Sequence, residues 1–211
     1  MQLNTGCLHI TRENMLLQIV VETERKVVLK INISREELMT INYQLGRTPE
    51  NLSGVALYCP FNKPAVLLTL PYSEENGIYP TIYWLSCPYL VREVATIEDQ
   101  GLVKELSTRL SDDEEFRKDL MAAHRKYAEK RVELISEEMK ERIKKSSKDI
   151  YKVLVESGVG GIRDKVGVKC LHTHLADFLL TNKNPVGKLV WGLVSWPEDC
   201  HICDLENIRD E

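Results

Sequence analysis

The 211-residue chain lacks a long apolar run, and without one it has no candidate for a membrane-spanning helix. Its longest apolar stretches, residues 16–21 and 65–70, fall far short of the roughly 18 residues that a bilayer span requires. The first residues also lack the basic stretch followed by an apolar core that marks a signal peptide. We therefore expect a soluble, cytoplasmic protein that makes no membrane contact.

Blocks of basic residues are missing as well. The chain has 28 Lys and Arg against 32 Asp and Glu, for a formal net charge of -4, and its cations are dispersed. A duplex-binding module needs clustered positive charge, so nucleic acid is unsupported as a partner. Hydrophobic residues make up 43% of the chain, enough for a core without disulfides. Abundant Lys, Glu, Ile and Val beside scarce Gln resemble a thermophilic composition.

Cysteine is scarce: six residues in 211, far below the roughly 8–10% of a disulfide scaffold. In a reducing cytosol such residues are thiols, metal ligands or transient redox pairs. Cys200 and Cys203 form a C-x-x-C, whose turn lets two thiolates bind one metal, but a tetrahedral site needs further ligands. The predicted cofactor is an iron–sulfur cluster or zinc, with ligands drawn from Cys59, Cys87, Cys170, Cys200, Cys203 and His172. The alternative for each single cysteine is a small buried hydrophobe.

The first half of the chain is rich in β-branched runs of strand length. They predict a hairpin over residues 15–33, a strand pair at 54–58 and 65–70, and a third strand at 81–85. Between the hairpin and the pair, Ser34 and Glu37 have the spacing of a capping box that opens a short helix ending near residue 45. We predict residues 1–44 to be an extension and residues 45–211 to form the main domain.

Glycine and proline are absent from residues 102–157, which favours helix. A capping box at Ser111 and Glu114, followed by apolar residues three, four and seven apart, predicts one long helix over residues 112–145. At 1.5 Å per residue such a helix would be about 45 Å long, more than a compact domain requires, so it is a candidate surface for a homodimer or another protein partner. The alternative is a solvated helix that breaks near Ser146. The fold class is α+β, with a small antiparallel β region in the N-terminal half packed against a mostly helical C-terminal half.

A further helix, predicted from about residue 168 to 180, carries a second group of reactive side chains. On an ideal helix Cys170, His174 and Asp177 share one face, suited either to a metal or to a thiol, base and orienting carboxylate. His172 points elsewhere, and approaches Cys170 only if Cys170 still belongs to the preceding loop. A surface Cys, His and Asp without a role is the alternative. As groups that could carry protons in a reaction we select Lys169, His172 and His124.

A glycine-rich stretch, Gly158 to Gly161, precedes this helix. Backbone N–H groups in such a loop can hold a small anionic ligand, and nearby cations would assist. The residues of this candidate anion loop are Gly160, Gly161, Arg163 and Lys165. The spacing matches neither the Walker motif nor the dinucleotide fingerprint, and glycines in a turn between helices need no ligand.

Short motifs along the chain resemble, in order, the bacterial family numbered 501 among the domains of unknown function. The similarity covers roughly residues 45–203 and is carried by Gln44-Leu-Gly-Arg47, Gly54-Val-Ala-Leu-Tyr-Cys-Pro60, Pro64-Ala-Val66, Pro80-Thr-Ile-Tyr-Trp-Leu-Ser-Cys-Pro88, Ala123-His124 with Tyr127, Gly158-Val-Gly-Gly161, Val168-Lys-Cys-Leu-His172 and Asn184-Pro-Val-Gly187. The resemblance implies a bacterial cytoplasmic protein, but no established activity. It places Cys59, Cys87, Cys170, His124 and His172 at signature positions. Relatives often carry His at the position of Asp177 and lack His174, which favours pairing of Cys170 with His172.

Three hypotheses of function follow, and they leave open whether the protein is an enzyme. The first is a Cys/His metal site, catalytic if one ligand position stays open and structural if the protein fills all four. The second is a non-catalytic interaction or regulatory protein that uses residues 112–145. The third is a thiol redox protein that uses Cys200 and Cys203, although no βαβ pattern accompanies that motif.

Overall fold

The computed structural model describes residues 33–75, 77–163, 166–204 and 206. The hairpin predicted over residues 15–33 lies outside them except for its last residue, and Cys7 and Lys165 also lie outside. In the described part, none of the helices combines the length and apolar character needed to cross a bilayer.

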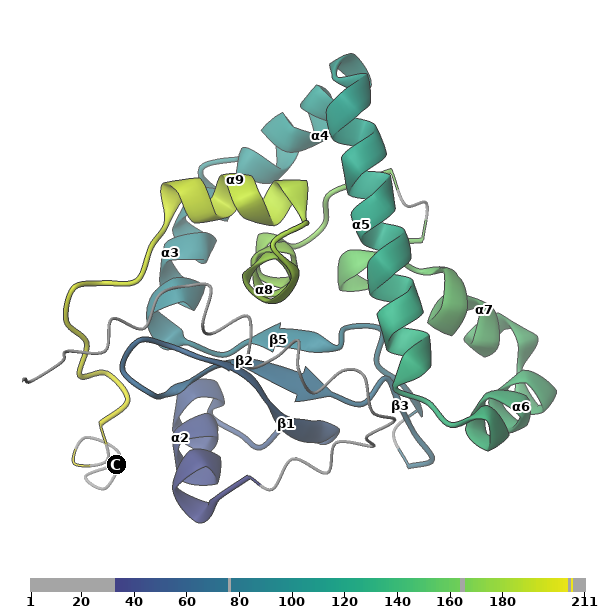
Figure 1. The fold of residues 1–211 in the computed structure, drawn as a ribbon, viewed down its shortest axis with the longest axis horizontal. Helices are drawn as coiled ribbons and strands as arrows, with labels where there is room; N and C mark the ends of the chain where they lie inside the picture. Colours follow the sequence, from purple (N-terminus) through teal and green to yellow (C-terminus); the bar gives the residue numbers. More distant parts are fainter. Residues whose placement is uncertain (1–32, 76, 164–165, 205, 207–211) are drawn as a thin grey trace, which may run out of the picture. The chain divides into compact units, whose positions relative to one another are not determined.

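A three-stranded antiparallel sheet lies at the centre of this region (Figure 1). Its strands are β1 (Leu52–Tyr58), β2 (Pro64–Thr69) and β5 (Tyr83–Leu85), in the order β1-β2-β5. The central strand β2 is buried along its whole length, because helix α2 (Arg35–Leu45) covers one face of the sheet and helix α8 (Leu171–Thr181) the other. A separate two-stranded ribbon joins β3 (Tyr72–Ser73) to β4 (Gly77–Ile78). The predicted central strands are thus confirmed within a few residues.

Helix α2 begins at the predicted capping box. The Ser34 hydroxyl accepts the Glu37 N–H at 3.1 Å, and the Glu37 carboxylate accepts the Ser34 N–H at 2.7 Å. From this helix Ile41 packs on Val55 and Leu67 of the sheet, and all three side chains are buried. The segment after the predicted hairpin therefore contributes to the core of the main domain.

The helical half contains more and shorter helices than predicted. They are α3 (Pro88–Asp99), α4 (Leu102–Asp112), α5 (Glu114–Glu133), α6 (Glu137–Ser146), α7 (Lys148–Glu156), the 3₁₀ turn η1 (Val159–Gly161), α8 and α9 (Pro185–Leu193). The α+β class, with the sheet in the N-terminal half, is confirmed.

The single helix predicted over residues 112–145 is wrong in its bounds. Asp113, and not Ser111, caps α5, because its carboxylate accepts the Phe116 N–H at 2.9 Å. The helix ends at residue 133, and Ser136 then caps α6 by accepting the Met139 N–H at 3.2 Å. Each of these two capping side chains favours the start of a new helix, and together they divide the segment. The spacing of apolar residues does not reveal such caps.

Helix α5 directs its apolar face into its own domain. The buried residues are Phe116, Leu120, Ala123, His124, Tyr127, Ala128 and Arg131, and α7 and α9 pack alongside. The extra length that suggested a protruding helix is therefore absent from this segment. Association with a partner through residues 112–145 stays a prediction, but helix length no longer supports it.

Arg131 connects α5 to the chain that follows α7. Its guanidinium, entirely buried, donates to the carbonyl oxygens of Pro80 and Leu154 at 2.8 Å each and of Gly158 at 3.1 Å. It also donates to the carbonyl of Ser157 at 2.8 Å and to its hydroxyl at 2.9 Å. One side chain thus holds residues 154–158 in place, and this segment leads into η1 beside the start of α8.

Candidate metal centre

The start of α8 differs from the prediction in a way that assembles the site. The helix begins at Leu171, and Cys170 is its N-cap residue, in extended conformation at φ -137° and ψ 113°. Cys170 therefore still belongs to the loop, which is the condition under which His172 approaches it. Its Sγ lies 3.8 Å from His172 Nδ1.

Glu98, near the end of α3, completes the group. One carboxylate oxygen, Oε1, lies 3.4 Å from His172 Nδ1 and accepts the Leu171 N–H at 2.5 Å. The ligand atoms of Glu98, Cys170 and His172 all lie within 4.8 Å of one another, and the three residues are half-buried. Among the residues that the structure describes, no other three Cys, His, Asp or Glu residues meet that criterion.

The far nitrogen of His172 is held by the backbone. Nε2 lies 3.0 Å from the carbonyl oxygen of Val91, which can only accept, so Nε2 carries the proton. In the neutral ring this leaves the lone pair of Nδ1 directed toward Cys170 and Glu98. A histidine that binds a metal through one nitrogen typically donates from the other in this manner.

The surroundings favour the charged forms of both Cys170 and His172. Burial acts to raise the pKa of the Cys170 thiol, but hydrogen bonds from His172 and from the backbone and hydroxyl of Thr173 outweigh it and lower that pKa. Burial acts to lower the pKa of His172, but Cys170, the Val91 carbonyl and Glu98 outweigh it and raise that pKa. The thiol is therefore readily ionised, as a metal ligand or nucleophile must be.

His174 and Asp177 do not share a face with Cys170 at a common site. Both side chains are buried and belong to a separate network around Asn184, the N-cap of α9. Asn184 donates to Asp177 Oδ2 at 2.8 Å, so its own Oδ1 accepts from His174 Nδ1, at 3.1 Å, and from the Gly187 N–H. The predicted face fails because the helix starts at Leu171, so that Cys170 is out of helical register with His174 and Asp177, whose side chains are buried.

His124 is also placed in the core, near this network. Its Nδ1 accepts the Val159 N–H at 3.0 Å, so Nε2 carries the proton and faces the Gly167 carbonyl at 3.2 Å. The chain passes so close that a Cβ on Gly158 would lie 2.6 Å from the His124 ring. With both nitrogens bound to backbone, His124 positions the η1 turn.

The glycine loop uses most of its backbone donors within the fold. The amides of Gly158, Gly161 and Ile162 donate to carbonyls within the turn, and that of Val159 donates to His124. Gly160 and Gly161 adopt positive φ values of 66° and 74°, and a Cβ on Gly161 would lie 2.9 Å from Pro80. Arg163 and Lys169 are exposed. Close packing explains these glycines, and binding of an anion here stays a prediction.

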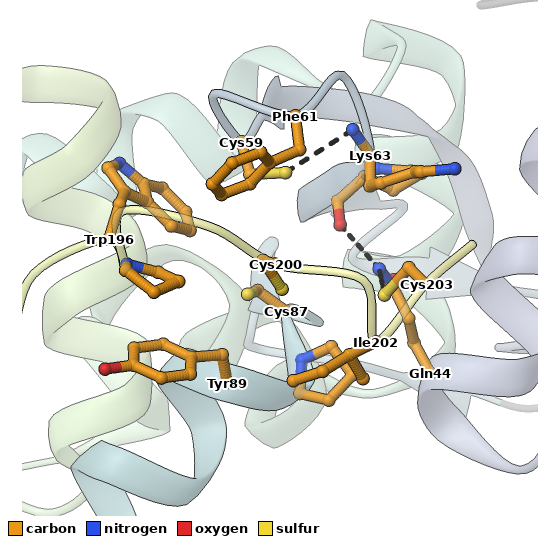
Figure 2. A pocket seen from close by; sticks show the side chains of 13 residues that line it. Gln44, Cys59, Phe61, Lys63, Cys87, Tyr89, Trp196, Cys200, Ile202 and Cys203 are labelled. Carbon is orange, nitrogen blue, oxygen red and sulfur yellow. Dashed lines mark hydrogen bonds between the residues drawn. The ribbon is translucent and has the colours of Figure 1, made fainter.

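Four other cysteines line one pocket at the opposite end of α3 (Figure 2). Cys59 comes from the β1–β2 turn, Cys87 is the N-cap residue of α3, and Cys200 and Cys203 come from the C-terminal segment. All four are free thiols. Burial raises the pKa of Cys87 to about 12 and also raises that of Cys203, so these thiols are neutral unless a cation is bound.

The six predicted ligands therefore divide into two groups. Cys87 and Glu98 lie eleven positions apart on α3, which corresponds to roughly 16 Å at 1.5 Å per residue. Cys170 and His172 join Glu98, while Cys59, Cys200 and Cys203 join Cys87. A single site that combines the Cys170 segment with the C-x-x-C is not what the structure shows.

Sequence reasoning missed Glu98. No local pattern marks it, since it is one of several acidic residues on a charged helix, and its partners lie more than 70 positions away in the chain. The Val91 carbonyl is a backbone group, so no pattern of side chains in the sequence could have identified it.

Comparison with protein families identifies the chain. The model of the family described as proteins of unknown function, DUF501, matches residues 55–192. The chain belongs to this family, and the matched segment contains Glu98, Cys170 and His172, together with Cys59 and Cys87. Comparisons with curated proteins and with solved structures gave no match.

Proposed function

We propose that Glu98, Cys170 and His172 bind one zinc ion and leave its fourth position open to water or substrate. The observation that supports this most directly is that a carboxylate, a thiol and an imidazole converge on one point, with both acidic groups facing Nδ1 of His172. In a nucleophilic Cys-His-acid triad the acid would contact the far nitrogen of the ring. Here that nitrogen faces the Val91 carbonyl.

The separations of the ligand atoms fit this proposal. Zinc bond lengths at tetrahedral angles correspond to about 3.4 Å between nitrogen and oxygen ligands and about 3.6 Å between nitrogen and sulfur. The structure has 3.4 Å from His172 Nδ1 to Glu98 Oε1 and 3.8 Å from Nδ1 to Cys170 Sγ. The ligands would need only a small adjustment.

Three protein ligands with an open position are typical of catalytic zinc, which acts as a Lewis acid and lowers the pKa of bound water to about 7. The chain supplies the rest of the arrangement. Val91 fixes the ring of His172, and the Leu171 N–H holds the Glu98 carboxylate. Exposed Lys169, adjacent to Cys170, offers a cation to an anionic substrate or a proton donor. Metal-assisted hydrolysis is the reaction class that we propose.

Removing any one of the three ligands is expected to remove one metal equivalent per chain. Cys170→Ser, His172→Asn and Glu98→Gln each delete a donor that chelation requires, and a two-ligand site binds zinc weakly. The measurement is elemental analysis of full-length protein stripped with chelator, reloaded with zinc and desalted. With cobalt in place of zinc, Cys170→Ser should also abolish one thiolate charge-transfer contribution.

Matched controls are available in the same chain. Asp99→Asn makes the same charge change one position further along α3, on an exposed side chain, and should leave the metal content unchanged. His201→Asn tests the loss of an exposed histidine. If all three ligand variants retain the full metal content of the wild type, the proposed centre is wrong.

A further inference from the structure

The cysteine pocket at the start of α3 is built from three distant parts of the chain. Its sulfur atoms come from a β-turn, a helix N-terminus and the C-terminal segment, and Figure 2 shows all four side chains around the same space. Besides the cysteines, the wall is mostly apolar and includes Phe61, Trp196 and Ile202. Gathering so many cysteines from separate elements is more than chance burial of small hydrophobes explains.

Two of these sulfurs accept hydrogen bonds from N–H groups. The Lys63 amide donates to Cys59 Sγ at 3.4 Å, and Gln44 Nε2 donates to Cys203 Sγ at 3.4 Å. Cys87 is the N-cap residue of α3, and its side chain makes no capping hydrogen bond. Neutral thiols are weak acceptors, whereas thiolates bound to a metal are typically surrounded by such donors.

The local backbone holds Cys59 rigidly. In the turn after β1, Cys59 donates its N–H to the Lys63 carbonyl at 2.9 Å, and Asn62 donates back to the Cys59 carbonyl at 2.9 Å. Asn62 adopts φ 58°, a left-handed conformation that asparagine tolerates. Pro60 and Pro64 restrict the chain on both sides of this turn. Cys59 is therefore presented to the pocket by a rigid element.

The C-terminal segment, in contrast, has little structure of its own. Described residues 194–204 contain no helix or strand, and Cys200 is half-buried while Cys203 is buried. Lys63 contacts Asp204 at 3.4 Å, and Gln44 contacts Cys203. Trp196 of this segment packs edge-on against Trp191 of α9, and the segment lines the pocket with Trp196, Pro197, Cys200, Ile202 and Cys203.

We propose that Cys59, Cys87, Cys200 and Cys203 form a second zinc site, closed by four thiolates, which fastens the C-terminal segment to the β1–β2 turn and to α3. No three of these sulfurs lie within 4.8 Å of one another, so binding draws the Cys200–Cys203 turn inward. With all four positions filled by protein the site is structural. It is independent of the centre at Glu98, at the other end of α3.

Metal stoichiometry in single variants tests this proposal. The full-length wild type is expected to hold two zinc ions per chain, and Cys59→Ser and Cys200→Ser should each hold one. Serine keeps the size of the side chain, and half-buried Cys200 tolerates it best, so that circular dichroism should stay close to that of the wild type. Cobalt bound to Cys170→Ser should retain the intense spectrum of four thiolates, and this spectrum should vanish in Cys200→Ser.

His201→Gln is the matched control within the C-x-x-C. This exposed ring contacts Asp199 at 3.1 Å and Asp204 at 2.7 Å and does not line the pocket, so the variant should keep both zinc ions. As a second readout, chelator should make the C-terminal segment susceptible to protease in the wild type. Added zinc should restore its protection in the wild type and in Cys170→Ser, but not in Cys200→Ser.

The outcomes separate the two sites. One zinc per chain, lost in Cys59→Ser and Cys200→Ser but kept in Cys170→Ser, would support this site and contradict the centre at Glu98. Unchanged zinc content in both Cys59→Ser and Cys200→Ser would overturn the four-thiolate site. A brown protein that contains iron and sulfide in similar amounts would overturn the assignment of zinc to this pocket.

Discussion

Replacing Arg131 with methionine is expected to lower the free energy of unfolding by about 3–5 kcal/mol, because several buried oxygens lose their donor at about 1–3 kcal/mol each. The guanidinium is 0% exposed and donates five hydrogen bonds to backbone and hydroxyl oxygens. Methionine fills much of the volume, but the carbonyl oxygens of Pro80, Leu154 and Ser157 lose the guanidinium as a donor, while that of Gly158 keeps the Gly161 N–H. An unsatisfied buried acceptor is destabilising by about 1–3 kcal/mol.

The physical basis is unusual because these acceptors are neutral. Burial lowers the pKa of Arg131 to about 10, which still leaves it charged at neutral pH. The Tyr127 ring, 5.4 Å from the guanidinium carbon, adds a cation–π contact. Charge-assisted hydrogen bonds to carbonyls are stronger than neutral ones, so the site tolerates an isolated buried cation.

Urea unfolding monitored by circular dichroism measures this effect. Arg125→Met, on the exposed side of the same helix, is the control and should stay within about 0.5 kcal/mol of the wild type. Arg131→Lys keeps the charge but not the planar fork of donors, so its stability should fall between those of the wild type and Arg131→Met. A loss below about 1 kcal/mol in Arg131→Met would show that this hydrogen-bond network contributes little.

The second large effect is a pH dependence located in the network around Asn184. Burial raises the pKa of Asp177 from 3.8 to about 7, and the hydrogen bond from Asn184 only partly offsets this. Between pH 4 and 7 the folded protein therefore holds a proton that the unfolded chain has lost. The resulting stabilisation is present below pH 4 and disappears as the pH rises through 7.

His174 has the opposite dependence. Burial, assisted by repulsion from His124, lowers its pKa from 6.5 to about 3. Among the described residues its buried Nε2 has no hydrogen-bond partner, and its Nδ1 donates to Asn184, which fits a neutral ring with the proton on Nδ1. Between pH 3 and 6.5 the unfolded chain binds a proton that the folded protein excludes, so this contribution to stability rises with pH. In the wild type the two contributions oppose each other between pH 4 and 6.5.

Single substitutions should separate the two contributions. Asp177→Asn keeps an oxygen for Asn184, and its stability relative to the wild type should increase by up to about 4 kcal/mol from pH 4 to 7, at about 1.4 kcal/mol for each unit of pKa shift. His174→Asn keeps a donor near the position of Nδ1, and its stability relative to the wild type should decrease from pH 3 to 6.5. The comparison with the wild type removes the titration of all other groups.

Urea unfolding at intervals of half a pH unit measures both differences. The double variant should show neither slope, apart from coupling between two residues that share Asn184. If both single variants run parallel to the wild type over this range, then neither side chain titrates differently in the folded and unfolded states. The assignment of these two side chains to the protected core would then be wrong.

Local sequence signals determined the elements whose stabilising contacts are close in the chain. The Ser34 capping box and the strands around Val66 form as predicted, since capping and β-branched runs act over a few residues. The sequence predicted helix bounds less well. Its apolar periodicity indicated one continuous helix, whereas capping by Asp113 and Ser136 starts separate helices. Helix α8 likewise begins at Leu171 and not at residue 168, because the preceding residues belong to a loop.

The residue types of the candidate sites could be selected from the sequence, but their grouping could not. Cysteines beside prolines and a Cys-x-His in front of an apolar stripe are visible as patterns. Which of them meet depends on how α3 and α8 pack against the sheet, and these contacts join residues that are tens of positions apart. Tertiary packing alone brings Glu98 to Cys170 and His172, and it gathers Cys59, Cys87, Cys200 and Cys203 at the opposite end of α3. The two groups stay separate because the two ends of a rigid helix cannot contribute to one site.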